Sequence, residues 1–137
     1  MRFNFGIVIF ILMGELIQST RKKGSQSEKI AFDYLTKNNF SILNQNWRSG
    51  KYGEIDIIAT DNSSGKLVFI EVKSRSTSTD DAKELVTKNK QRQLYKLAKS
   101  YLYLNGKENC SCRFDVIAIR INKEGNKLEH IRNAFYK

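Results

Sequence analysis

The amino-acid sequence predicts an α/β domain in which a mixed β-sheet is flanked by helices. Two strand-like segments, 53–60 and 67–73, are separated by a cluster of turn-forming residues. Segments with helical periodicity, 25–37 and 87–104, lie before and after this pair, and another apolar run, 113–119, follows the second helix. At 137 residues the chain is long enough to form one domain with a core of its own.

The two strand-like segments are predicted to form an antiparallel hairpin, because the six residues Asp61–Lys66 between them are mostly turn formers. If Thr60 pairs with Leu67, the same register sets Asp56 opposite Glu71. It also sets the preceding Glu54 opposite Lys73, and directly opposed residues project to the same face with Cβ atoms about 4.5–5.5 Å apart.

Facing carboxylates at Asp56 and Glu71 would repel each other on a half-buried sheet unless a positive charge lies between them. Mg²⁺ suits this position, since it is typically bound by one or two carboxylates together with substrate phosphate oxygens. Lys73 would reach the same pocket, where it could orient or help to deprotonate an attacking water.

The alternative is an edge hairpin in which Glu54, Glu71 and Lys73 form surface ion pairs of little energetic consequence. Residues 68–72 favour the functional interpretation, because both faces of this segment are largely apolar and the strand therefore looks central. Charged groups that interrupt a buried surface usually have a function.

The first helix has a capping-box pattern, with Ser25 as the cap and Glu28 three residues later. Glu28 shares a stripe with Ala31, Phe32 and Leu35, so it points toward the core side. Capping alone would explain this glutamate. A carboxylate on the inward stripe would equally suit a position behind the metal ligands.

The second helix separates apolar from basic residues. Its apolar arc is Leu94, Leu97, Ala98, Tyr101 and Leu104, and its basic row is Lys88, Arg92, Lys96 and Lys99. Such a row could follow a phosphate backbone or could be an ordinary solvated face. Gln91 and Tyr95 lie at the border between the two arcs, where they could contact phosphate or be half-buried.

The remaining elements are a first strand over 40–47 and a last short element over 128–135. Cys110 and Cys112 form a Cys-x-Cys without a second ligand pair, so we expect free thiols in the reducing cytoplasm and no zinc site. The net charge is +10 and the isoelectric point about 9.7, which makes polyanions the favoured partners. We expect neither a small-molecule substrate nor a membrane partner.

The N-terminus admits three explanations. Residues 3–13 are nearly all apolar, but no cleavage site follows and Glu15 ends the run short of the roughly 20 residues needed to span a bilayer. The start codon could be assigned too early, with Met13 as the initiator, or the segment could be an extra helix or a weak membrane-surface anchor. We favour the first explanation and divide the chain into an extension, 1–19, and one domain, 20–137.

Several motifs together resemble the YraN-like uncharacterised protein family. They are Gly24-x-x-Ser27-Glu28-x-x-Ala31, Asn46-Trp47-Arg48, Gly53-Glu54-Ile55-Asp56-Ile57-Ile58-Ala59, Phe69-Ile70-Glu71-Val72-Lys73-Ser74-Arg75, Lys90-Gln91 and Arg113-Phe114-Asp115-Val116. That family is placed among the restriction-endonuclease-like PD-(D/E)XK nucleases, close to Holliday junction resolvases. The resemblance therefore implies a restriction-endonuclease-like fold over residues 20–137.

The resemblance also implies roles for individual residues. Asp56 and Glu71 would be metal ligands together with the Val72 carbonyl, Lys73 would be the catalytic lysine, and Glu28 would be the helix-borne acidic residue of resolvase-like members. Gln91 with Tyr95 is similar to the Gln-x-x-x-Tyr motif of the exonuclease branch. The expected nucleic-acid-binding residues are Arg48, Arg75, Lys88, Gln91, Arg92, Tyr95, Lys96 and Lys99.

The first hypothesis is an endonuclease that uses Mg²⁺, with Mn²⁺ as an alternative, to hydrolyse DNA, with branched structures as candidate substrates. A homodimer is expected by analogy with junction resolvases, which cut two strands symmetrically. The second hypothesis is a non-catalytic nucleic-acid-binding protein with the same fold. The third is an interaction module whose apolar N-terminus docks to a membrane or a partner.

Overall fold

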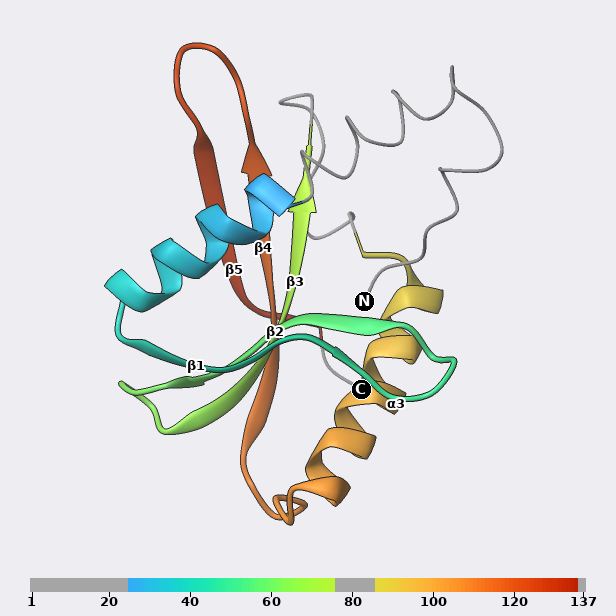
Figure 1. The fold of residues 1–137 in the computed structure, drawn as a ribbon. Helices are drawn as coiled ribbons and strands as arrows, with labels where there is room; N and C mark the ends of the chain where they lie inside the picture. The colour runs from blue at the N-terminus through green and yellow to red at the C-terminus, as the bar shows by residue number, and fades with distance from the viewer. Residues whose placement is uncertain (1–24, 76–85, 136–137) are drawn as a thin grey trace.

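The computed structural model describes residues 25–75 and 86–135 (Figure 1). Residues 25–37 form a helix, which the other elements follow in the order β1 (Phe40–Arg48), β2 (Glu54–Asp61), β3 (Lys66–Ser74), α3 (Lys88–Leu104), β4 (Cys112–Arg120) and β5 (Lys127–Phe135). Each segment predicted as a helix or a strand is confirmed to within about two residues at its ends. The predicted extension, 1–19, lies outside the described residues.

The strands form one sheet in the order β1-β2-β3-β4-β5. Neighbouring strands are antiparallel except β3 and β4, which are parallel because α3 crosses over between them. The predicted hairpin register is confirmed, with Thr60 opposite Leu67. The predicted fold class is also confirmed, since a mixed sheet flanked by helices is consistent with the restriction-endonuclease-like fold.

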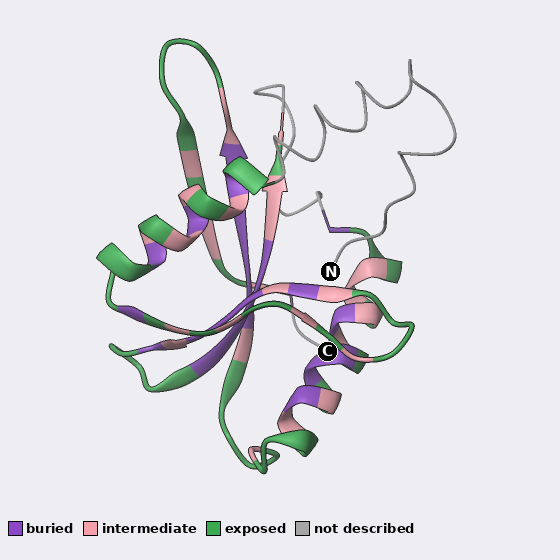
Figure 2. Cartoon of the chain, viewed as in Figure 1, coloured by how far each residue is buried: buried purple, intermediate pink, exposed green. Residues whose placement is uncertain are grey.

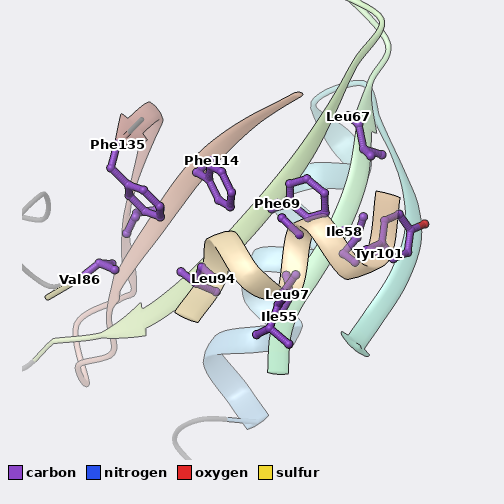
Figure 3. Close-up of a cluster of buried hydrophobic side chains, with 12 residues drawn as sticks. Ile55, Ile58, Leu67, Phe69, Val86, Leu94, Leu97, Tyr101, Phe114 and Phe135 are labelled. Carbon is purple, nitrogen blue, oxygen red and sulfur yellow. The ribbon is translucent and has the colours of Figure 1, made fainter. Parts of the chain in front are cut away.

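The two helices cover opposite faces of the sheet (Figure 1). Under α3, Phe69 packs with Leu94, Leu97 and Tyr101 (Figure 3). On the other face, the helix over 25–37 packs its buried residues against a second cluster, which contains Ala31, Leu35, Val68, Ile70 and Ile117. Residues 67–71 are all buried, as the purple central strand in Figure 2 shows, and this confirms that β3 is central.

Helix α3 begins after Thr87, whose side chain accepts a hydrogen bond of 3.1 Å from the Lys90 amide. Its apolar arc is buried as predicted except for Leu104, which is 67% exposed. That assignment was wrong because Leu104 is the last helical residue, one turn beyond the buried Tyr101. The other helix is helical from Ser25, the first residue described there, and its predicted capping box stays a prediction.

Among the described helices, none combines the length and the apolar character that crossing a bilayer requires.

Candidate functional site

The candidate site lies where β2 and β3 part. Their backbone pairing runs from the turn as far as Ile57 and Ile70. One position further, the Asp56 Oδ2 accepts a hydrogen bond of 2.9 Å from the Val72 backbone N–H. A carboxylate thus takes a donor that would otherwise pair with a strand carbonyl, and the hairpin opens here in that the backbone pairing of β2 with β3 ends.

Glu54 is engaged with β1 at this opening. It lies opposite Arg48 in the β1–β2 register, where the Arg48 Nε donates a hydrogen bond of 3.0 Å to its Oε2 and the Nη2 forms an ion pair with the same oxygen at 2.8 Å. The predicted cross-strand pairs, Asp56 with Glu71 and Glu54 with Lys73, are both absent from the ladder, because the β2–β3 pairing has already ended whereas the β1–β2 pairing continues.

Three carboxylates gather beside the opening. One ligand oxygen from each of Glu28, Glu54 and Asp56 lies within 4.8 Å of the other two. Glu54 and Asp56 come from β2 and Glu28 comes from the helix over 25–37, so this group of carboxylates joins the strand to that helix. Glu54 was not predicted to be a site residue, although its position two residues before Asp56 on a strand could have indicated that it lies nearby.

Glu71 is the most buried acid of the site, with 5% of its side chain exposed. Its Oε1 lies 3.5 Å from the Lys73 Nζ and 3.7 Å from the Lys90 Nζ. Its other oxygen, Oε2, is buried and accepts no hydrogen bond from the described residues. A buried carboxylate oxygen without a donor is costly, and a bound cation is one of its usual partners.

Lys90 was assigned no role from the sequence. It lies in the first turn of α3, far along the chain from the hairpin, and only the packing of α3 on the sheet brings it to Glu71. The capping of α3 by Thr87 holds that turn in place. The carboxylate is therefore placed between two ammonium groups that come from different elements.

The pKa of Asp56 is raised to about 7, first by burial and then by the charge of Glu71, with Glu28 and Glu54 contributing less and the Val72 N–H acting in the opposite direction. Burial also raises the pKa of Glu71, although Lys90 and Lys73 favour its ionised form. Burial is thus the main cause of both shifts, and at Asp56 the neighbouring carboxylates add to it. A divalent cation would favour the ionised form of both groups.

The donors present fit a hard divalent cation such as Mg²⁺. Carboxylate and carbonyl oxygens are the ligands that such ions prefer, and Asp56, Glu71 and the Val72 carbonyl could supply them. Glu28 and Glu54 lie close enough to Asp56 to accept hydrogen bonds from water on such an ion.

The predicted nucleic-acid-binding residues fall into two groups. Arg92, Lys96 and Lys99 line a pocket of about 380 Å³ on α3 together with Tyr95, and Lys88 is exposed near the start of the helix. The others make contacts within the protein. Arg48 pairs with Glu54, Arg75 pairs with Glu129 at 3.1 Å, and the Gln91 amide donates to the Val86 carbonyl at 3.0 Å.

Tyr95 belongs partly to both groups. Its ring packs edge-on against Phe114 and lies near Phe135, with centroids 4.8 Å and 6.2 Å away, so its body is part of the core under α3. Its hydroxyl is buried without a hydrogen-bond partner among the described residues. Gln91 and Tyr95 therefore hold α3 to its surroundings and do not meet the carboxylates through any described contact.

A second charged cluster lies at the opposite end of β2. Arg113 donates to the Asp61 Oδ2 at 2.8 Å and to both oxygens of Asp115 at 2.9 and 3.1 Å. Asp115 also accepts from His130 at 2.8 Å and from the Asn133 backbone at 2.9 Å. Burial opposes ionisation, but these donors hold the pKa of both aspartates below the ordinary value.

Cys110 lies between α3 and β4, and Cys112 is the first residue of β4. Both cysteines are free and exposed.

Comparison with known proteins identifies similar chains in many bacteria. The model of "Uncharacterised protein family UPF0102" matches residues 27–119. A UPF0102 protein of Clostridium botulinum is 43% identical over 82% of this chain and 92% of its own. Those of Geobacter sulfurreducens and Chlorobium chlorochromatii are 39% and 38% identical, over 90% and 86% of this chain and 95% and 94% of theirs.

Among solved structures, Pyrococcus furiosus SfsA in complex with Ca²⁺ has 15% identity and a TM-score of 0.36, over 82% of this chain and 63% of that one. This likeness is too weak to inform the function.

Proposed function

The chain belongs to the uncharacterised protein family UPF0102, and from this premise we propose that it is an Mg²⁺-dependent endonuclease that hydrolyses DNA phosphodiester bonds. Its proposed substrate is branched DNA, and its proposed location is the cytoplasm. Mn²⁺ is proposed to substitute for Mg²⁺. The observation that carries the proposal is the unpartnered, buried Oε2 of Glu71 close to Asp56, whose pKa is raised to about 7.

The ligands proposed for the ion are the carboxylates of Asp56 and Glu71 and the carbonyl of Val72. When bound, Mg²⁺ would polarise the phosphate and lower the pKa of a water molecule. Asp56 is already oriented by the Val72 N–H, and Glu71 is oriented by the lysines at its Oε1. These contacts hold two ligands in place before an ion arrives, which limits the entropy lost on binding.

Lys73 is proposed to orient the attacking water or to neutralise charge on the phosphate. Its side chain is 35% exposed and its Nζ is 3.5 Å from Glu71, so it can reach both the ligands and a substrate in solvent. Glu28 is proposed to accept a hydrogen bond from water on the ion, because its carboxylate faces Asp56 from the neighbouring helix.

The exposed cations of α3 are proposed to contact the DNA backbone. Lys88, Arg92, Lys96 and Lys99 are all exposed on this helix, and the net charge of +10 favours a polyanion. Binding should therefore weaken as the salt concentration rises, with a slope that becomes shallower by roughly one for each phosphate-contacting lysine removed.

The decisive experiment is a cleavage panel. Linear, nicked, flapped and four-way-junction DNA would be incubated with the protein in Mg²⁺, in Mn²⁺ and in EDTA. We expect metal-dependent cleavage of branched DNA, which Asp56→Asn and Lys73→Ala should each lower by at least about 100-fold. Glu124→Gln and Lys123→Ala are the matched controls, because both residues are exposed between β4 and β5.

The second hypothesis, a binding protein without catalysis, predicts another outcome of the same panel. DNA would be bound equally by the wild type and by both site variants, and no substrate would be cut in either metal. That result would refute the endonuclease.

A homodimer is proposed by analogy with enzymes that cut two strands symmetrically. Light scattering coupled to size-exclusion chromatography, with and without junction DNA, tests it. A monomer under both conditions would overturn the dimer but not the chemistry of the site.

A further inference from the structure

The loop between β1 and β2, residues 49–53, is held against α3. The Gln93 side chain donates a hydrogen bond to the Tyr52 carbonyl. Gly53 has φ +95°, and a Cβ at this position would lie 2.6 Å from the Gln93 Nε2. Only glycine allows both the left-handed backbone and this close approach. The loop is therefore fixed on the helix surface.

The fixed loop presents an aromatic side chain to solvent. Tyr52 is 55% exposed, and the Lys96 Nζ lies over its ring, 5.9 Å from the centroid. This geometry is that of a cation–π contact. Lys51, the preceding residue, is also exposed. The loop tip thus combines an accessible aromatic ring with adjacent positive charge.

Tyr52 lies next to the carboxylates. Gly53 alone separates it from Glu54, so the Cα atoms of Tyr52 and Glu54 are at most about 7.6 Å apart. The Glu54 carboxylate belongs in turn to the group within 4.8 Å that includes Asp56. A strand whose phosphate reached the carboxylates would place a neighbouring nucleotide at the loop.

Helix α3 connects the same two places. Lys90, Gln93 and Lys96 are spaced by three residues and so lie along one side of the helix, over a length of about 9 Å. The first contacts Glu71, the second Tyr52 through its carbonyl, and the third the Tyr52 ring. Lys96 also lines the basic pocket with Arg92, which extends the surface beyond the loop.

We propose that Tyr52 stacks on an unpaired base of the DNA strand held at the carboxylates, while Lys96 and the pocket cations contact its phosphates. The inference deepens the proposed function and rests on it. An exposed ring accepts the face of any base, and inside a duplex both faces of a base are covered by the neighbouring base pairs. The substrate class is therefore DNA with single-stranded nucleotides beside the cleavage position, as in a flap.

The test is DNA binding in EDTA, so that nothing is cut. Fluorescence anisotropy would compare a labelled single strand of about 16 nucleotides with a duplex of equal length. Tyr52→Ala should weaken single-strand binding roughly five- to thirty-fold and duplex binding less than about twofold. Tyr52→Phe should bind like the wild type, because the ring is kept.

The matched control is Tyr103→Ala. Tyr103 is 71% exposed near the C-terminal end of α3, so its loss removes a comparable exposed ring outside the loop that is proposed to hold the base. Equal losses in the two alanine variants, an equal loss on duplex, or an unchanged affinity for Tyr52→Ala would each overturn the proposal.

This experiment fails independently of the proposed nuclease activity. If no DNA is ever cut but Tyr52→Ala loses single-strand affinity, the enzyme is refuted and the stacking surface stands. If Asp56-dependent cleavage is found and Tyr52→Ala binds like the wild type, the enzyme stands and the stacking surface is refuted.

Discussion

Each end of β2 carries an aspartate, and the pKa values of the two aspartates are shifted in opposite directions. Asp56 and Asp61 are five positions apart on one strand, yet the pKa of Asp56 is raised to about 7 whereas that of Asp61 is lowered. Burial disfavours ionisation at both positions. The difference comes from the neighbours, which are carboxylates around Asp56 and the guanidinium of Arg113 beside Asp61.

The buried acids on the neighbouring strands differ in the same way. Asp115 accepts four hydrogen bonds, from Arg113, His130 and Asn133, and its charge is matched within the protein. Glu71 has two cations at one oxygen and no donor at the other. The protein therefore supplies all the hydrogen-bond partners that the Asp115 carboxylate needs, whereas the Glu71 Oε2 is left for a bound ligand.

The largest expected effect concerns Asp115 and its hydrogen-bond partners. Asp115→Ala should lower the free energy of unfolding by about 3–5 kcal/mol, because it leaves the buried guanidinium of Arg113 without its bidentate partner. Urea titration measures this loss. Glu129→Ala, which removes an exposed ion pair with Arg75, is the comparison and should cost less than about 1 kcal/mol. Equal losses would show that the buried network is not a stability element.

The next effect concerns a divalent cation bound beside Asp56 and Glu71. At pH 8, in a Mg²⁺ or Mn²⁺ concentration 100 times the Kd at that pH, the free energy of unfolding should rise by about 2.7 kcal/mol. The same ion concentration is then used at pH 5.5. The gain should be larger at pH 8 than at pH 5.5, because the ion must displace the proton from Asp56, whose pKa is about 7. Thermal unfolding with and without the ion checks this. A gain that is equal at both pH values, or that persists in Asp56→Asn, would contradict the assigned site.

Asp56→Asn should make the metal-free protein more stable at pH 8, by roughly 1–3 kcal/mol. The folded-state pKa of about 7 exceeds the ordinary 3.8, so the stability associated with protonated Asp56 is complete below pH 3.8 and is lost as the pH rises through 7. The neutral amide keeps an acceptor for the Val72 N–H without that loss. Urea titrations at pH 5 and pH 8 measure the difference, and a variant that is less stable at pH 8 would contradict the expectation.

The smallest expected effect concerns Lys90. A double-mutant cycle with Glu71→Gln and Lys90→Met should give a coupling free energy of about 0.5–1 kcal/mol, since the ammonium group is partly exposed and 3.7 Å from the carboxylate. The same cycle with Lys88→Met, an exposed lysine one half-turn earlier, should give a value near zero. Equal coupling free energies for the two lysines would mean that they reflect the overall positive charge of α3 and not the contact between Lys90 and Glu71.

Local pattern determined the elements and one register. Alternation and turn residues specified β2, β3 and the pairing of Thr60 with Leu67, and the apolar character of 68–72 identified the central strand. These features depend on residues near each other in the chain, so the sequence alone could predict them. The proximity of Glu71 and Lys73 on one face of β3 followed from the same alternation, whereas Asp56 is joined to β3 through the Val72 N–H.

Tertiary structure decided what depends on distant segments. Because the pairing of β2 with β3 ends early, Glu54 does not pair with Lys73 and instead contacts Arg48 of β1. The packing of α3 on the sheet brings Lys90 to Glu71 and Gln93 to the Tyr52 loop. The network that satisfies Asp115 joins β2, β4 and β5. Periodicity shows which face a side chain takes, but charge compensation depends on distances that only the packed sheet and helices set.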